Sequence, residues 1–336
     1  MLRQYSDGDH SFEIDVESQL NAWAKVKLES IGCHDIPNEK ALLVYFEHCI
    51  RVPSPKPRLV KISKELKCPS GCEVAFERLK IALSDGKDIH QFLSKRVYSG
   101  KENKEDGMLY DWSLLHFHFC TREEKSNELY KESWRYLLIA YMNPLRDDVI
   151  YLLQIVPHRN INWADSSYLE ILRENWADEL SMLFFSGYLC LKDGSRIDLS
   201  ENEIINLRKN GIHTLAPVTP QTLYISPSLG CQNNERSTLA SIEAMTICNQ
   251  FNALVLYLSG HIELLVKKLQ ILTQTNHVIL VPVATDIQRG IFCIEEESIL
   301  VVVDHSTIEC VLFEKGQRDE TIREIAETMK IGFVAA

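Results

Sequence analysis

Histidines and arginines gather in the middle of the chain, in segments that alternate apolar and polar residues. His116 and His118 are separated by a single residue. Arg135 lies in the next such segment, and His158 ends the third. An imidazole can accept or donate a proton near neutral pH, because its ordinary pKa is about 6.5. A guanidinium can hold a phosphate through two N–H groups and stabilise the charge that develops on it. These residue types suit cleavage of RNA by its own 2′-hydroxyl.

The leading hypothesis is therefore a metal-independent endoribonuclease that uses no cofactor. His116 and His118 would act as acid and base, and Arg135 would contact the phosphate, with His158 in support. Well-placed acid–base catalysis of this kind contributes a factor of roughly 10²–10⁴ to the rate.

Residues that could bind the substrate lie close to these segments. Unpaired bases stack on aromatic rings, and Trp112, Trp134 and Trp163 are available for this. Arg159 follows His158 directly, and a basic, proline-rich stretch covers residues 51–67. The candidate substrate-binding residues are Trp112, Arg159, Trp163, Arg58 and Lys61.

Two other hypotheses fit the same sequence. His116, His118 and His158 could supply three nitrogen ligands to zinc, which would make the protein a zinc-dependent hydrolase. No carboxylate second shell for those ligands is evident in the sequence. Alternatively, the histidines are ordinary half-buried residues, and the chain is a non-catalytic interaction or sensor subunit of a bacterial defence system.

The histidines depend on strands for their placement. Residues 111–120, 134–141 and 149–156 read as strands with short connections, which favours an antiparallel meander. Alternate residues of a strand share a face, so His116 and His118 should project together, opposite Leu115 and Phe117. The stretch 99–107 before them is polar and predicts an exposed loop.

The rest of the chain mixes helices and strands. Helical periodicity covers 15–50, a short alternating strand follows at 58–63, and the capping-box pair Ser200 and Glu203 begins a helix near 199–208. Further helices are expected at 73–84, 88–97, 165–176, 237–257, 259–273 and 319–329, and strands at 277–283, 290–295, 299–304 and 307–313. The sequence therefore predicts an α+β fold with a mostly helical N-terminal region at 1–105, a central sheet domain at 106–185 and a C-terminal α/β domain at 186–336.

Composition limits the setting of the protein. The 336 residues carry a formal net charge of −11, which argues against a general nucleic-acid coat protein but permits a local basic pocket. No apolar run approaches the roughly 18–20 residues of a membrane span, and the N-terminus lacks the apolar centre of a signal peptide. The ten cysteines are scattered, and Cys68 and Cys72 read as a reduced turn. A cytoplasmic protein without disulfides or a membrane association is expected.

The central segment resembles two groups of proteins. Asp111 to Phe119, the strand ending at His158 and the helix ending at Trp176 are similar to an uncharacterised bacterial family reading Asp-Trp-Gly-Ile-His-His-Leu-His-Leu. Ser113, Leu115 and Ala177 depart from that pattern, and Leu115 replaces a histidine that the family has. The strand order is also similar to RelE-type ribonuclease toxins, which cleave RNA without metal. That resemblance implies a bacterial toxin or antiviral defence nuclease, with RNA as substrate and an antitoxin or defence subunit as a protein partner.

Overall fold

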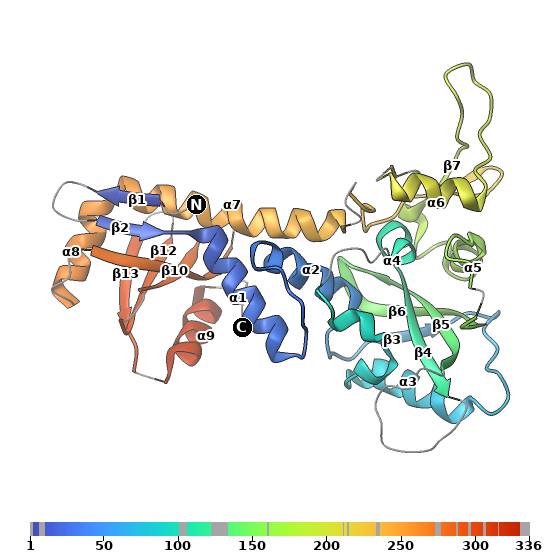
Figure 1. Ribbon diagram of the computed structural model, residues 1–336, viewed down its shortest axis with the longest axis horizontal. Helices are drawn as coiled ribbons and strands as arrows, with labels where there is room; N and C mark the ends of the chain where they lie inside the picture. The colour runs from blue at the N-terminus through green and yellow to red at the C-terminus, as the bar shows by residue number, and fades with distance from the viewer. Residues whose placement is uncertain are drawn as a thin grey trace. The chain divides into compact units, whose positions relative to one another are not determined.

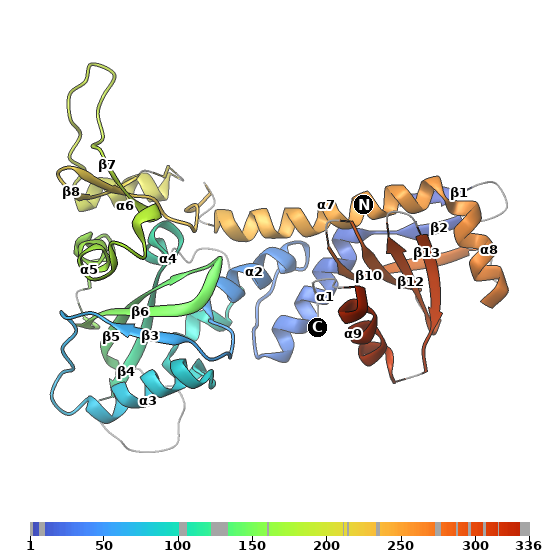
Figure 2. The same cartoon turned by 180° about the vertical axis from the view of Figure 1, so that it is seen from behind.

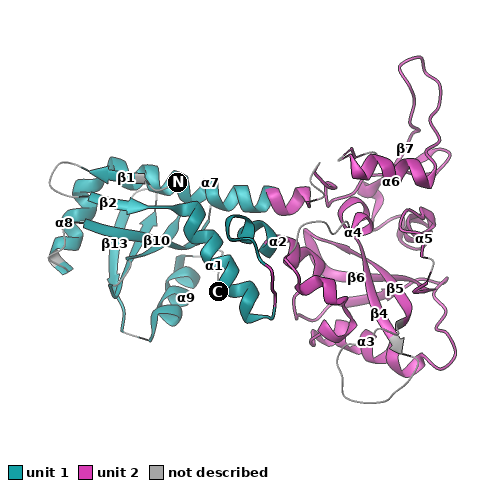
Figure 3. Ribbon diagram, in the orientation of Figure 1, with its two compact units in different colours: residues 1–32, 36–45, 242–336 teal, residues 33–35, 46–241 magenta. Residues whose placement is uncertain are grey.

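The chain forms two compact units, which are described separately (Figure 3). In the computed structural model the described residues are 3–6, 11–100, 106–121, 134–159, 161–210, 212–213, 215–232, 236–272, 277–286, 288–294, 297–304, 307–314 and 316–329, without the side chains at 120, 121, 134 and 271. Unit 1 comprises residues 1–32, 36–45 and 242–336, and unit 2 comprises 33–35 and 46–241. Both units mix helices with sheets, so the expected α+β class is confirmed.

Unit 2 is built on a four-stranded sheet of order β3-β6-β5-β4, in which β3 is parallel to β6 and the other pairs are antiparallel. A three-stranded sheet of order β7-β9-β8 accompanies it. The elements of unit 2 are β3 (Leu59–Ile62), α3 (Glu73–Asp85), η2 (His90–Phe92), η3 (Lys95–Tyr98), α4 (Gly107–Trp112), β4 (Leu114–Thr121), β5 (Trp134–Asn143), β6 (Arg146–Pro157), α5 (Ser167–Trp176), η4 (Ser181–Leu183), β7 (Phe184–Ser186), α6 (Glu201–Lys209), β8 (Ala216–Thr219) and β9 (Thr222–Tyr224).

Helices cover both faces of the four-stranded sheet (Figures 1 and 2). On one face Leu115 and Phe117 of β4 pack in a core with Leu79 of α3. On the other face Leu137 of β5 packs with Leu169 of α5. Successive residues 137–142 of β5 enter the two cores in turn, as strand geometry requires.

Unit 1 contains a six-stranded sheet of order β1-β2-β10-β11-β12-β13, in which β2 and β10 are parallel. Its elements are β1 (Arg3–Ser6), β2 (Ser11–Ile14), α1 (Val16–Ser30), η1 (Asn38–Lys40), α8 (Ile262–Leu272), β10 (His277–Thr285), β11 (Gly290–Ile294), β12 (Ile299–Asp304), β13 (Thr307–Leu312) and α9 (Arg318–Met329). Two helices cross the boundary between the units, α2 (Ala41–Arg51) and α7 (Thr238–Gly260). The division differs from the three ranges expected from sequence, because β2 pairs with β10 and so joins the N-terminal residues to the C-terminal region.

Helix α7 is the one helix of the described chain whose length of 23 residues and apolar composition would allow a membrane span. The sequence showed no continuous apolar run of this length, because polar residues such as Glu243 interrupt it. Phe251 and Leu258 of α7 are fully buried, and the ring of Phe251 lies 5.5 Å from that of Phe292 in β11. In unit 1 the buried face of this helix therefore packs on the sheet.

Three local expectations are wrong. The helix expected at 88–97 is absent, and these residues form only the short 3₁₀ helices η2 and η3. Asp111 and Trp112 belong to helix α4 rather than to the strand, because Ser113 adopts a positive φ of 58° that ends the helix before β4 begins. Cys72 is disulfide-bonded to a partner outside the described side chains, whereas Cys68 is a free thiol. Spacing along the sequence does not show such a pairing, so the expectation of a chain without disulfides fails here.

Candidate active site

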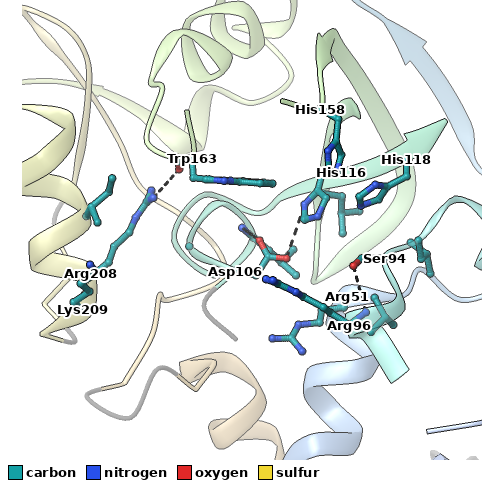
Figure 4. Close-up of a pocket in the computed structure, with 16 residues that line it drawn as sticks. Arg51, Ser94, Arg96, Asp106, His116, His118, His158, Trp163, Arg208 and Lys209 are labelled. Carbon is teal, nitrogen blue, oxygen red and sulfur yellow. Dashed lines mark hydrogen bonds and ion pairs between the residues drawn. The ribbon is translucent and has the colours of Figure 1, made fainter. Parts of the chain in front are cut away.

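A pocket of about 690 Å³ opens in unit 2 beside the first half of strand β4 (Figure 4). Its walls come from the end of α2, from η3, from the start of α4, from β4 and the end of β6, and from α6. The lining residues are Arg51, Leu93, Ser94, Arg96, Val97, Asp106, Gly107, Leu109, Leu115, His116, His118, His158, Trp163, Ile205, Arg208 and Lys209.

Strand β4 presents both of its histidines to this pocket. His116 is paired with Ile139 of β5, and His118 with Leu137. Phe117 between them points to the opposite face, where it is completely buried. The shared face of the two imidazoles therefore follows from the strand period of two residues, as the sequence predicts.

His158 joins this pair from the end of β6. Its backbone N–H donates to the carbonyl of Arg135 at 2.9 Å, which continues the β5–β6 ladder by one residue. The ring of His158 lies 5.0 Å from that of His118, and the ring of His118 lies 5.6 Å from that of His116. The structure thus brings together all three histidines that the sequence singles out.

The three imidazoles are not equivalent. His118 is 7% exposed, and both of its ring nitrogens are shielded from solvent. Burial, followed by the charges of His116 and His158, lowers the pKa of His118 to about 3, so this ring is neutral at physiological pH. His158 lies at the exposed end of β6, and partial burial followed by the charge of His116 lowers its pKa. Proton exchange with a substrate is therefore easier at His116 and His158 than at His118.

The carboxylate of Asp106 lies next to the ring of His116. Asp106 is the N-cap of α4 and accepts a hydrogen bond from the N–H of Leu109 at 3.2 Å. Its Oδ2 lies 4.0 Å from Nδ1 of His116, within ion-pair range. Because Nδ1 is buried on this side, His116 has its Nε2 left for the pocket. Asp106 is thus placed to orient the ring.

The tryptophans differ in their availability. Trp163 is 41% exposed, and its ring meets that of His116 edge-on at 5.2 Å, so one aromatic face lies next to the histidines. Trp112 is buried, and the guanidinium of Arg208 covers its ring at 4.4 Å, so the expectation that Trp112 stacks a base is wrong. The side chain of Trp134 lies outside the described residues.

Two expected cations lie outside the pocket. Arg135 shares a strand face with Leu137, which pairs with His118. It lies two residues from Leu137 along β5, on the side away from the residue that pairs with His116. Its exposed side chain extends over the ring of Tyr136, with the guanidinium carbon 5.9 Å from the ring centre. Arg159 follows β6 and is exposed to solvent without lining the pocket. The sequence predicts that Arg135 acts beside the histidines, but in the structure its side chain does not line their pocket.

Arg58 and Lys61 are occupied by structural contacts instead of forming a basic surface. Arg58 is 6% exposed and binds the carboxylate of Asp147 at 3.0 Å and its carbonyl at 2.8 Å. Lys61 forms an ion pair with Glu179 and lies over the ring of Tyr151. Neither residue lines the pocket, so their expected role in substrate binding is not supported.

Other cations line the pocket instead of these residues. Arg51 ends α2, Arg96 lies in η3, and Arg208 and Lys209 end α6. Arg51 is the first residue of the basic stretch noted in the sequence. Asp106 lies in the polar stretch 99–107, for which the sequence predicts an exposed loop. Residues 101–105 of that stretch are outside the described part of the chain. No periodic pattern connects these residues, because segments far apart in the sequence bring them to the pocket.

Arg208 is held by a network around Asp111. Its Nε donates to one oxygen of Asp111, and its Nη1 donates to the carbonyl of Trp163 at 2.8 Å. The other oxygen of Asp111 lies 3.2 Å from Nδ1 of His213, and Nε2 of His213 meets the carbonyl of Cys231. Both ring nitrogens of His213 thus face acceptors. The contact with Asp111 is the main cause that raises the pKa of His213.

This network predicts a pH-dependent contribution to stability. Because the pKa of His213 is raised in the folded protein, its contribution is complete below the unfolded value of about 6.5 and is lost as pH rises through the folded pKa. Wild-type protein should therefore exceed His213→Gln in unfolding free energy by more at acidic than at alkaline pH. Urea unfolding between about pH 5.5 and 8.5 measures this difference. The exposed His34→Gln is the control, and a gap that widens with pH would contradict the assignment.

Metal binding has no geometric support in the described part of the chain. No group of three or more His, Cys, Asp or Glu side chains there is arranged to hold a metal ion. The histidines converge through ring contacts of 5.0–5.6 Å, and one of them has both nitrogens shielded.

Comparison with known proteins gives no match to a protein family, to a curated protein or to a solved structure.

Proposed function

We propose that unit 2 is a metal-independent endoribonuclease whose acid and base are His116 and His158. The observation that carries this proposal is the convergence of His116, His118 and His158 in one pocket that also contains arginines and an exposed tryptophan. This combination provides proton transfer, phosphate binding and base stacking in one place.

His158 is the better placed base. Its lowered pKa leaves it neutral near pH 7, so it can take the proton of the 2′-hydroxyl. The 2′-oxygen then attacks the adjacent phosphorus, and the bond from phosphorus to the 5′-oxygen breaks. His116, supported by Asp106, gives a proton to that leaving oxygen. The products are a 2′,3′-cyclic phosphate and a 5′-hydroxyl, and proton exchange with water restores both rings.

The remaining residues support these steps. Arg51 lines the pocket and interacts electrostatically with Asp106, which helps to hold that carboxylate beside His116. His118 contacts both reacting rings and, as a neutral group, helps to fix their positions. This assignment replaces the pair His116 and His118, because both ring nitrogens of His118 are shielded from solvent.

The resemblance to RelE-type toxins is the basis for a proposal about the biological role. Strands β4, β5 and β6 are antiparallel neighbours. We therefore propose a toxin or phage-defence role in a bacterial cytoplasm, with a protein partner that restrains the nuclease.

The first experiment is cleavage of total RNA by purified protein in the presence of EDTA. Wild-type protein should cut the RNA, and the variant His116→Ala/His118→Ala should not, while both show the same circular dichroism spectrum. Full cleavage by that variant would refute the site. Loss of cleavage in EDTA that zinc restores would replace the proposal by a zinc-dependent hydrolase. Stable folding with no cleavage under any condition would favour a non-catalytic subunit.

The pH profile tests which histidine is the base. If His158 accepts the proton, kcat/KM should rise with pH along a limb whose midpoint lies below 6.5, because the pKa of His158 is lowered from that value. His158→Ala should remove this limb together with most of the activity. Initial rates on a short RNA measure the profile. A limb centred above 6.5, or one that persists in His158→Ala, would assign the base elsewhere.

A further inference from the structure

The cations of the pocket differ in whether a carboxylate compensates them. Arg208 is paired with Asp111, and Arg51 has Asp106 and Glu47 as electrostatic neighbours. In the part of the chain that the structure describes, the guanidinium of Arg96 and the ammonium of Lys209 have no acidic partner. Both residues are exposed. The pocket thus carries two uncompensated positive charges in a protein whose net charge is −11.

These two charges lie on opposite sides of the pocket. Lys209 ends helix α6 beside Arg208, on one side of Trp163 (Figure 4). Arg96 lies with Arg51 on the other side, beyond Asp106 (Figure 4). The catalytic histidines and the exposed face of Trp163 lie along the wall between them. A ligand that contacts both cations must extend across the pocket, as a strand with several phosphates does.

We infer that the pocket binds single-stranded RNA along its length, with one phosphate held by Arg96 and another by Lys209. The scissile phosphate lies between them at His116 and His158, and an adjacent base stacks on Trp163. This inference rests on the proposed ribonuclease function and narrows its substrate to strands that carry phosphates on both sides of the cut. Duplex RNA is excluded as the preferred substrate, since its bases are not free to stack on a side chain.

Binding of DNA strands tests the inference without requiring catalysis. A short deoxythymidine strand has the same phosphates as RNA but no 2′-hydroxyl, so it cannot be cut by this mechanism. Its Kd is measured at several salt concentrations for wild type, Arg96→Gln, Lys209→Gln and the control Lys67→Gln, which is exposed and lies outside the pocket. Each phosphate contact contributes about −0.7 to the slope of log K against log salt for a single strand.

Arg96→Gln and Lys209→Gln should each make that slope less steep by about 0.7, and Lys67→Gln should leave it unchanged. A thymidine dinucleotide has a single phosphate and can contact only one of the two cations at a time, so its slope with wild-type protein should be less steep than that of the longer strand by at least about 0.7. Unchanged slopes in both variants, or failure of the wild type to bind the strand, would overturn the inference. Binding with the expected slopes but without cleavage of RNA would refute the proposed enzyme and leave the strand-binding surface standing.

Discussion

Replacing His116 and His158 together by alanine is expected to lower RNA cleavage by roughly 10²–10⁴, because it removes both partners of the proton transfer. Each single variant should account for most of that loss, since either missing step stops the reaction. His118→Ala should lower the cleavage rate less, because the nitrogens of His118 are shielded and its ring only helps to position the other two histidines. Initial cleavage rates with saturating RNA provide the measurement.

Two controls make this result specific. His34→Ala removes an exposed histidine of the same unit that does not line the pocket, and it should keep the wild-type rate. Arg135→Gln separates the site seen in the structure from the one expected from the sequence. The account would be contradicted if the folded variant His116→Ala/His158→Ala retained the full rate, or if Arg135→Gln lost as much activity as that double variant.

The largest expected effect on stability belongs to a buried ion pair in unit 2. Glu47 of α2 is 3% exposed, and its Oε2 lies 2.5 Å from Nη1 of Arg236. Its Oε1 accepts from the N–H of Ser237 at 3.2 Å, at the start of α7. Arg236→Met leaves the carboxylate buried without this partner, and such losses cost about 3–5 kcal/mol. Arg51 is a second cation near Glu47, which places the expected cost near the lower end of that range.

The double variant Glu47→Gln/Arg236→Met distinguishes the lost charge pairing from lost packing. Glutamine keeps an acceptor for Ser237 and carries no charge, so the double variant should recover most of the stability lost in Arg236→Met. The exposed pair of Arg196 and Asp198 gives the control, and Arg196→Met should cost less than about 1 kcal/mol. Urea unfolding of the full chain measures all of these differences. A double variant as unstable as Arg236→Met would show that the charge is not the cause.

The sequence predicts the histidine wall of the pocket because that wall depends on local geometry. Alternation with a period of two places His116 and His118 on one face, and Pro157 marks the end of the strand that delivers His158. The capping box of Ser200 and Glu203 likewise locates the start of α6, and both of its hydrogen bonds are present. Features of this kind involve residues within a few positions of one another.

The cations of the pocket could not be predicted in the same way. Arg51, Arg96 and Lys209 belong to three segments that carry no shared pattern, and tertiary contacts alone bring them to the pocket. Arg135 was favoured because it lies on a neighbouring strand, but the register places it beyond His118 rather than beside His116. Register depends on the pairing of whole strands, which a single strand's alternation does not determine.

The position of Asp106 next to His116 could not be predicted from the sequence either. Its role depends on the short helix α4, which begins where the sequence shows a polar stretch and ends at the positive φ of Ser113. The sequence therefore predicts a strand through Asp111 and Trp112, and it offers no reason to place a carboxylate behind His116. The helix brings Asp106 to the ring and turns Asp111 toward Arg208 instead.

The most direct measurement uses a DNA strand that contains a single ribonucleotide, incubated with the protein in EDTA and analysed by mass spectrometry. The account predicts one cut, directly after the ribonucleotide, with a 2′,3′-cyclic phosphate on one product and a 5′-hydroxyl on the other, and no cut in the all-DNA strand. Cleavage of the all-DNA strand, or products with a 5′-phosphate, would show that the 2′-hydroxyl is not the nucleophile and would contradict the roles given to His116 and His158.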